Sequence, residues 1–162
     1  MTLVCILSFL FDGIFSLLFN NNSMFLTLFS LMCLIVIYPY LKKSNYIFYI
    51  AAIIGIFFDI VYTQTLFLNT IIFFLLSFLI YFYYKYLPYN IVNTLILSLI
   101  MIVLYRLITY IFFIIFNDNM FNIHALLKSI YNSIISNFIY IILMNSFCKI
   151  ILKKKVIINK IQ

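Results

Sequence analysis

The sequence predicts an all-α membrane protein, a bundle of six transmembrane helices with both termini in the cytoplasm. Of its 162 residues, 68% are hydrophobic and only 8% are charged, whereas roughly a quarter of the residues in a soluble domain are charged. The mean hydropathy is +1.26, and a water-soluble fold of this size cannot bury so much apolar surface. The apolar residues also form six runs, each near the ~17–25 residues that cross a bilayer as a helix.

Polar residues mark the beginning and end of each run. The runs cover residues 2–19, 24–41, 46–62, 66–84, 91–116 and 125–148. The first run occupies the place of a signal peptide, but it lacks a basic segment, contains Asp12 and ends in asparagines instead of a small-residue cleavage site. We therefore expect it to remain as the first helix.

Short polar connections separate the runs. They lie at residues 20–23, 42–45, 63–65, 85–90 and 117–119. These connections are rich in Asn, Lys and Thr, and the fourth contains Pro88, so each is a natural place for a helix to end. The whole chain has only 2 Gly and 2 Pro, and long irregular loops are not expected.

The lysines predict the orientation of the bundle. The second and fourth connections contain Lys42, Lys43 and Lys85, whereas the first, third and fifth contain neither Lys nor Arg. Five lysines follow the sixth run, namely Lys149, Lys153, Lys154, Lys155 and Lys160. The positive-inside rule then places both termini in the cytoplasm. We divide the chain into one six-span domain, residues 1–148, and a basic tail, residues 149–162, which faces the anionic membrane surface and not nucleic acid.

Apart from Lys128 at the start of the sixth run, three charged residues lie within the apolar runs: Asp12, Asp59 and Arg106. Each costs about 2.5–3.5 kcal/mol at the centre of a membrane helix, so each should face protein and find a partner. We expect Arg106 to pair with one of the two aspartates and to fix the packing of the bundle. A site for an ion, a proton or a ligand, and a contact with the membrane segment of a partner protein, are the alternatives.

Gly55 and Asp59 form the most informative pair in the chain. They are four residues apart, so they share one helix face. A glycine leaves room for another helix to approach, and a carboxylate in an apolar run is expensive unless it has a partner. This face is the place where we expect a specific contact, either within the bundle or with a partner.

The sixth run carries polar side chains at helical spacing. The stripe consists of Ser129, Asn132, Ser133, Ser136, Asn137 and Tyr140. Small and amide side chains on one face let helices approach and form hydrogen bonds across the contact. Packing inside the bundle is the favoured interpretation of Asn132, Ser133 and Asn137, ahead of a surface for another protein.

The residues that enzymes and cofactors require are missing from the sequence. It contains no metalloprotease motif, no phosphate-binding glycine loop and no plausible catalytic triad, so we expect neither an enzyme nor a cofactor. Cys5, Cys33 and Cys148 are isolated and lie in or beside apolar runs, which is typical of small buried hydrophobic residues. His124 has no partners at metal-ligand spacing, so no metal site is predicted.

Residues 52–61, with Gly55 and Asp59, resemble the rod shape-determining MreD family. That family has a G-x-x-x-D element followed by a polar turn and another helix, a final span that bears an asparagine, as Asn132 does here, and a basic tail. Two features differ. The family often has a small residue, commonly Gly, in the turn after the aspartate, where Phe67 or a neighbour stands here. Its common Pro-Asp pair before the second span is replaced by residues 22–23.

The resemblance implies a non-enzymatic scaffold of the cell-wall elongation machinery, in the cytoplasmic membrane of a bacterium. The implied partners are MreC, MreB, RodA and a class B penicillin-binding protein. On this reading Gly55 and Asp59 shape the bundle or a partner-binding face, and the basic tail with Lys153, Lys154 and Lys155 lies toward cytoplasmic components.

A second family offers a different function. Six short spans in a chain of this length also resemble the substrate-binding component of energy-coupling-factor vitamin transporters. Such proteins need a polar cavity, and some use an Ala-x-x-x-Ala surface for their coupling partner. Alanine is rare here, which weakens this alternative, whereas a pocket lined by Asp12, Asp59, Arg106 and Asn137 would favour it.

Overall fold

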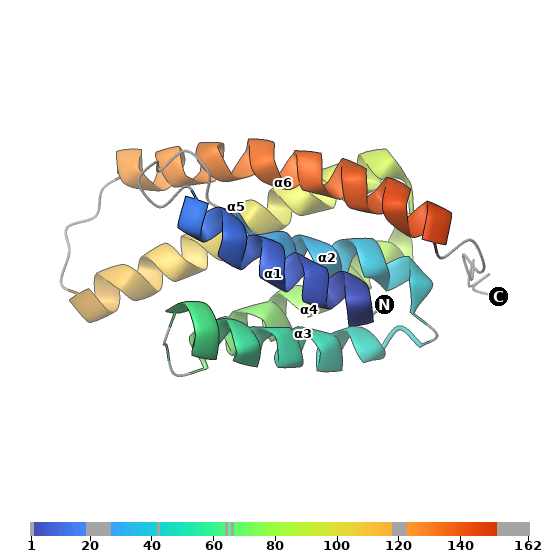
Figure 1. The fold of residues 1–162 in the computed structure, drawn as a ribbon. Helices are drawn as coiled ribbons and strands as arrows, with labels where there is room; N and C mark the ends of the chain where they lie inside the picture. Colours follow the sequence, from blue (N-terminus) through green and yellow to red (C-terminus); the bar gives the residue numbers. More distant parts are fainter. Residues whose placement is uncertain are drawn as a thin grey trace.

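The structure, a computed structural model, describes residues 2–18, 27–41, 43–63, 65, 67–117 and 123–151. Every regular element within these ranges is helical, as predicted, and six α-helices follow one another along the chain (Figure 1). They are α1 (Thr2–Leu18), α2 (Phe29–Ile37), α3 (Tyr46–Phe58), α4 (Leu68–Tyr86), α5 (Ile91–Asn117) and α6 (Ile123–Ile151). A 3₁₀ turn, Tyr38–Tyr40, extends α2, and a π-helical turn, Asp59–Thr63, extends α3.

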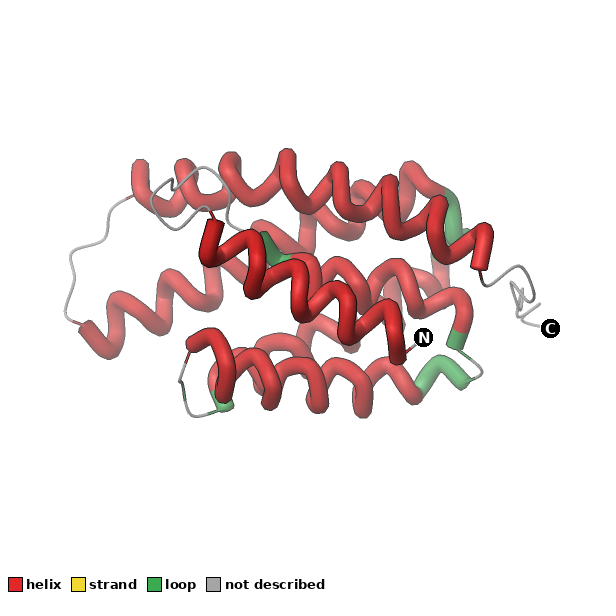
Figure 2. Tube along the Cα trace, viewed as in Figure 1, coloured by secondary structure: helices red, strands yellow, loops and turns green. Residues whose placement is uncertain are grey.

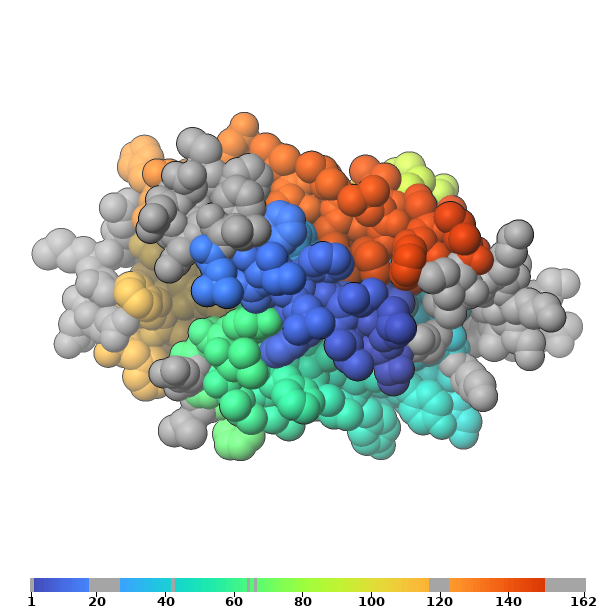
Figure 3. Space-filling view, viewed as in Figure 1, coloured from blue at the N-terminus to red at the C-terminus, as the bar shows by residue number. Residues whose placement is uncertain are grey.

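Helix α2 is the core of the bundle. All nine of its residues are buried, and it contacts each of the other five helices. Its sequence is apolar on every side except at Ser30, as expected for a helix without an exposed face. Figure 2 shows the helices packed around it, and on the face shown in Figure 3, α1 lies between α6 and α3.

The outer helices present apolar surface. Four stretches are long and apolar enough to cross a membrane, namely Tyr46–Thr63, Leu68–Tyr86, Ile91–Phe116 and Ile123–Ile150. Large apolar side chains are exposed on each of them, for example Ile60, Ile71, Ile115 and Leu143. Contiguous apolar surface of this extent indicates a membrane protein.

The second run is shorter than predicted. We expected a span over residues 24–41, but α2 begins only at Phe29, and residues 24–26 lie outside the described ranges. Even with its 3₁₀ turn, α2 is about 18 Å long at 1.5 Å per residue, whereas the hydrocarbon core of a bilayer is about 30 Å thick. In the part of the chain that the structure describes, α1 and α2 are shorter apolar helices than the other four stretches. The first turn of α2 therefore lies inside the bundle, where its N–H groups need partners from the protein.

The start of α1, the α2–α3 and α4–α5 connections and the end of α6 lie at one end of the bundle (Figure 1). The lysine pattern predicts this arrangement, because Lys43, Lys85 and Lys149 belong to these segments. Lys85 and Lys149 lie in the last turns of α4 and α6. Helix α6 continues through residues 148 and 149 to Ile151, and the predicted boundary between a six-span domain and a basic tail stays a prediction.

The other lysines of the predicted membrane-surface cluster cannot be placed in this arrangement. Lys42, Lys153, Lys154, Lys155 and Lys160 lie outside the described residues. The side of the membrane to which this end belongs stays a prediction from the sequence.

Candidate functional site

Asp59 accepts hydrogen bonds from the first turn of α4. Its Oδ1 accepts from the backbone N–H of Asn69 at 2.9 Å, and its Oδ2 accepts from the backbone N–H of Thr70 at 2.9 Å. The hydroxyl of Thr70 also donates to Oδ2 at 2.8 Å, and the side-chain amide of Asn69 donates to Oδ1 at 3.0 Å. The first N–H groups of a helix have no partner within the helix, and a carboxylate also suits the positive end of the helix dipole. Asp59 thus caps α4 from the preceding helix.

The local sequence explains why the cap comes from another helix. The residue that precedes α4 is Phe67, and it makes no side-chain cap of its own. The turn supplies further donors instead, since the hydroxyls of Thr65 and Thr63 lie 2.6 Å and 3.4 Å from Oδ1. Only 3% of Asp59 is exposed, so six donors hold a buried carboxylate in place.

Gly55 lets α3 approach α4 closely enough for this cap to form. A Cβ at position 55 would stand 2.5 Å from the Cα of Thr70 and 3.1 Å from the backbone oxygen of Asn69. Because both obstacles are backbone atoms, neither can move aside cheaply. The expectation that Gly55 makes room for another helix is confirmed, and the helix is α4 of the same chain.

Asn69 extends the network to α5. Its side-chain amide donates to Asp59 and to the hydroxyl of Thr63, and its Oδ1 accepts from the hydroxyl of Tyr105 at 2.7 Å. Asn69 is 1% exposed and Tyr105 is 5% exposed. The cap of α4 therefore joins three helices through a single buried amide.

Asp12 caps the start of α2, as Asp59 caps the start of α4. Its Oδ1 accepts from the backbone N–H of Phe29 at 2.8 Å, and its Oδ2 accepts from the N–H and hydroxyl of Ser30 at 2.7 Å and 2.5 Å. Asn137 of α6 adds a further acceptor, since its Oδ1 lies 3.0 Å from the N–H of Leu28. The buried start of α2 is thus satisfied by side chains from α1 and α6.

Arg106 does not pair with either aspartate, and this corrects the expectation from the sequence. The donors to the two carboxylates, among the residues that the structure describes, are backbone N–H groups, hydroxyls and the Asn69 amide. Arg106 instead donates from Nε to the hydroxyl of Ser133 at 3.0 Å. The sequence shows charged side chains, but it does not show which helix start needs a hydrogen-bond acceptor. The predicted ion pair therefore named the wrong partner for the two aspartates.

The polar stripe predicted on the sixth run faces the bundle. Ser133 and Asn137 are fully buried, and Asn132 is 8% exposed. Asn137 also donates to the backbone oxygen of Ser133 at 2.6 Å, and the hydroxyl of Tyr140 forms a hydrogen bond with that of Ser8 on α1. These contacts are the ones expected of packing within the chain.

A cavity of ≈ 450 Å³ lies beside the Asp59 cap, where α4 begins and the second half of α5 passes it. One part of its wall is polar and consists of Thr63, Thr65, Asn69, Tyr105, Arg106 and Thr109. The other part is apolar and consists of Leu68, Phe112, Phe113 and Phe116. Cavities of this volume are typical of ligand sites. A pocket lined by Asp12, Asp59, Arg106 and Asn137 would favour the vitamin-transporter alternative, but of these four residues Arg106 alone lines this cavity.

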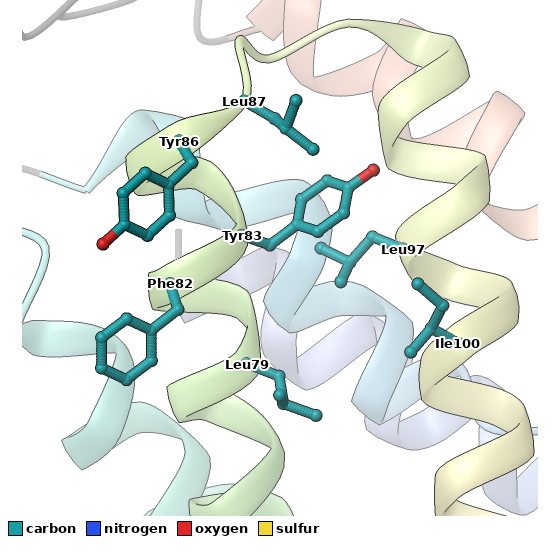
Figure 4. Close-up of a pocket in the computed structure, with 7 residues that line it drawn as sticks. All are labelled: Leu79, Phe82, Tyr83, Tyr86, Leu87, Leu97 and Ile100. Atoms are coloured by element: carbon teal, nitrogen blue, oxygen red, sulfur yellow. The ribbon is translucent and has the colours of Figure 1, made fainter.

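A second hollow of ≈ 320 Å³ lies toward the other ends of the same two helices (Figure 4). Leu79 and Tyr83 project from α4 toward Leu97 and Ile100 of α5. Outside this hollow, Tyr89 of the α4–α5 connection donates to Asn145 of α6 at 2.8 Å, and burial raises the pKa of its phenol. The hollow itself offers apolar contacts and no chemistry.

Sequence reasoning missed Ser30, Asn69, Thr70 and Tyr105, which complete the two caps. Ser30 and Thr70 are of the residue types that commonly cap the starts of helices. Nothing in the sequence, however, indicates that either hydroxyl donates to a carboxylate on another helix. No group of three His, Cys, Asp or Glu side chains that could hold a metal occurs in the described ranges. Cys5, Cys33 and Cys148 are free thiols.

Comparison of the chain with protein-family models, with curated proteins and with solved structures found no match.

Proposed function

We propose that this chain is a non-enzymatic membrane scaffold of the bacterial cell-wall elongation machinery, acting in cell shape as the resemblance to the MreD family implies. The observation that carries the proposal is the turn between α3 and α4. Its three distinctive positions are Gly55, Asp59 and Phe67, and they belong to one structural unit. The proposal includes MreC, MreB, RodA and a class B penicillin-binding protein as partners.

Phe67 supports the resemblance because of its backbone. Its φ is 58°, and no other non-glycine residue of the described ranges has a positive φ. This left-handed region favours glycine strongly over a large side chain. The family commonly has glycine in this turn, so the chain keeps the backbone that a glycine would favour although the residue has changed.

The distribution of polar groups supports a scaffold more than an enzyme. The two buried carboxylates accept hydrogen bonds from the starts of α2 and α4. The buried polar side-chain atoms of the described residues all have hydrogen-bond partners. The outer surfaces are apolar, and α5 is the least covered of the four long helices, with 17% of its most apolar stretch buried against 44% for α6. Such a helix offers area for lipid or for the membrane segment of a partner.

The vitamin-transporter alternative rests on the cavity beside Asp59. Its mixed lining and its volume of ≈ 450 Å³ suit a small ligand. Of the four residues whose shared pocket would favour this alternative, Asp12 and Asn137 instead bond the start of α2, and Asp59 caps α4. We therefore keep the scaffold as the favoured function.

A crosslinking pull-down from native membranes tests the proposal. A tag on the C-terminus of the full chain is expected to recover MreC or a wall synthase. Recovery of an energy-coupling membrane subunit with its ATPases would instead establish a substrate-binding component. The matched variants are Asp59→Leu and Lys128→Leu, which removes an exposed charge of α6, compared at equal abundance. Normal cell shape and complex formation with Asp59→Leu would show that the α4 cap is not needed for the scaffold role.

A further inference from the structure

We propose that Cys5 and Cys33 are a peroxide-reactive thiol pair, which hydrogen peroxide converts into a disulfide bond between α1 and α2. The two residues are 28 positions apart in the sequence and belong to different apolar runs. In the structure they are in contact, because the thiol of Cys33 donates to the sulfur of Cys5 with 3.9 Å between the two Sγ atoms. Both thiols are free. This site requires no protein partner, so it stands apart from the proposed scaffold role.

The Asp12 cap determines which residues of α1 and α2 meet. The two helices run in opposite directions (Figure 1), and Asp12 fixes α1 against the N–H groups of Phe29 and Ser30. Cys5 precedes Asp12 by about two helical turns and therefore lies on nearly the same face of α1. Cys33 follows these two residues by about one turn and shares their face of α2. The contact between the sulfurs thus follows from the hydrogen bonds that hold the start of α2.

The two thiols differ in their access to a small oxidant. Cys5 is partly exposed, whereas Cys33 is fully buried. Cys5 lies in the first turn of α1, next to the buried face that Val4 and Ser8 present to the bundle. An accessible thiol beside a second thiol is typical of sites that form a sulfenic acid and then a disulfide. We therefore assign the reaction with peroxide to Cys5, and the subsequent attack on its oxidised sulfur to Cys33.

The chemistry has two steps, and hydrogen peroxide is the oxidant in both. The sulfur of Cys5 attacks one oxygen of the peroxide, the O–O bond breaks, and Cys5 becomes a sulfenic acid while one water leaves. The sulfur of Cys33 then attacks the sulfur of Cys5, the S–O bond breaks, and the departing hydroxide takes the proton of the Cys33 thiol as a second water. Each sulfur has lost one electron, and the two electrons have reduced the peroxide.

The bond needs little movement of the helices. A disulfide has its sulfurs about 2.05 Å apart, so they must approach by about 2 Å from the contact distance of 3.9 Å. Rotation about the Cα–Cβ bond of a cysteine moves its sulfur between staggered positions and leaves the backbone in place. The bond ties α1 to the central helix α2. Cytoplasmic thiols are kept reduced, so at the predicted cytoplasmic end of α1 the disulfide would form under oxidative conditions and be reversed by reduction.

Peroxide treatment of the reduced full chain in detergent micelles, followed by intact mass measurement and peptide mapping, tests the proposal. We expect the chain to lose two hydrogen atoms and two of its three free thiols, with a Cys5–Cys33 link that dithiothreitol reverses. The melting temperature should rise by about 5–10 °C on oxidation, because the link restricts the unfolded chain. Cys148→Ala is the matched control. It removes the other buried thiol, on α6, and should leave both results unchanged.

Two further variants separate the roles of the thiols. Cys33→Ala should form no link and should accumulate a sulfenic acid at Cys5 that dimedone traps, whereas Cys5→Ala should form neither product. A Cys5 that is oxidised in the unsubstituted chain without a link to Cys33 would overturn the proposal. So would a link that joins two chains, or equal loss of all three thiols. These outcomes are read on the unsubstituted chain, so the test stays decisive if a variant does not fold.

Discussion

The starts of α2 and α4 are capped by the same three hydrogen bonds, although they lie in different parts of the bundle. In each, one oxygen of an aspartate accepts from a backbone N–H, and the other accepts from the next N–H and from the hydroxyl of that residue. Asp12 and Ser30 form one set, and Asp59 and Thr70 form the other. Two charges that would be costly in a membrane thus have one structural explanation.

The surroundings of the two caps differ. The start of α2 is held from both sides, because Asn137 of α6 accepts the N–H of Leu28, and α2 is buried throughout. The start of α4 is held by its own turn and lies beside a cavity. The same set of bonds therefore fixes the core of the bundle at Asp12 and a hairpin next to a cavity at Asp59.

Asp12→Leu is expected to have the largest effect. It leaves the N–H groups of Phe29 and Ser30 unpaired inside the protein, where both residues are buried. We expect the free energy of unfolding to fall by ~3–5 kcal/mol, measured by denaturant titration in mixed micelles. Asp12→Asn, which keeps one acceptor oxygen, should lose less, and a loss smaller than that of Asp59→Leu would break the comparison.

Asp59→Leu is expected to cost less, about 2–3 kcal/mol, because water in the adjoining cavity can reach the freed N–H groups of Asn69 and Thr70. The same titration measures it. Thr65→Val removes one of the six donors to the carboxylate and should cost about 1 kcal/mol. Equal losses for the two aspartates would show that the cavity does not soften the effect.

The two glycines provide a sharper test of the hairpin. Gly55→Ala places a methyl group against the backbone of Thr70, so we expect a loss of about 1–3 kcal/mol, typical of overpacking. Gly13→Ala is the matched control, because its methyl group meets the end of the Tyr62 side chain and not backbone, so the neighbour can shift at the cost of its hydrogen bond to Phe9. Thermal unfolding of both variants should rank Gly55→Ala clearly below Gly13→Ala; similar melting temperatures would count against close α3–α4 contact.

The sequence predicts the helices well and their partners poorly. Alternation of apolar runs with polar connections is a local signal, and α4, α5 and α6 begin and end within about two or three residues of the predicted ranges. The importance of Gly55 and Asp59 was also predictable, since the cost of a carboxylate in an apolar run is known from its type alone. What the carboxylate binds depends on which helix start lies beside it.

The short α2 shows why the site could not be predicted. The run over residues 24–41 looks like a span, but α2 begins at Phe29, and the buried N–H groups at its start become the partners of Asp12 and Asn137. Arg106 was the one cation away from the ends of the apolar runs. The sequence shows only side chains, so the reasoning paired one charge with another. Backbone donors at a buried helix start leave no such mark in the sequence.

Phe67→Gly is the prediction with the smallest expected effect and the one that most directly contrasts the two caps. A left-handed backbone costs a residue with a Cβ about 1–2 kcal/mol, and part of the gain from glycine is lost to the greater freedom of the unfolded chain. We therefore expect Phe67→Gly to raise the free energy of unfolding by about 0.5–1 kcal/mol, measured by the same denaturant titration. The corresponding residue before α2, Leu28, has a φ of −138°, so Leu28→Gly should destabilise the protein instead. If Phe67→Gly also destabilised the protein, the contacts of the phenyl ring would stabilise the turn by more than the backbone strain costs. The side chain of Phe67, and not the Asp59 cap, would then determine the conformation of the turn.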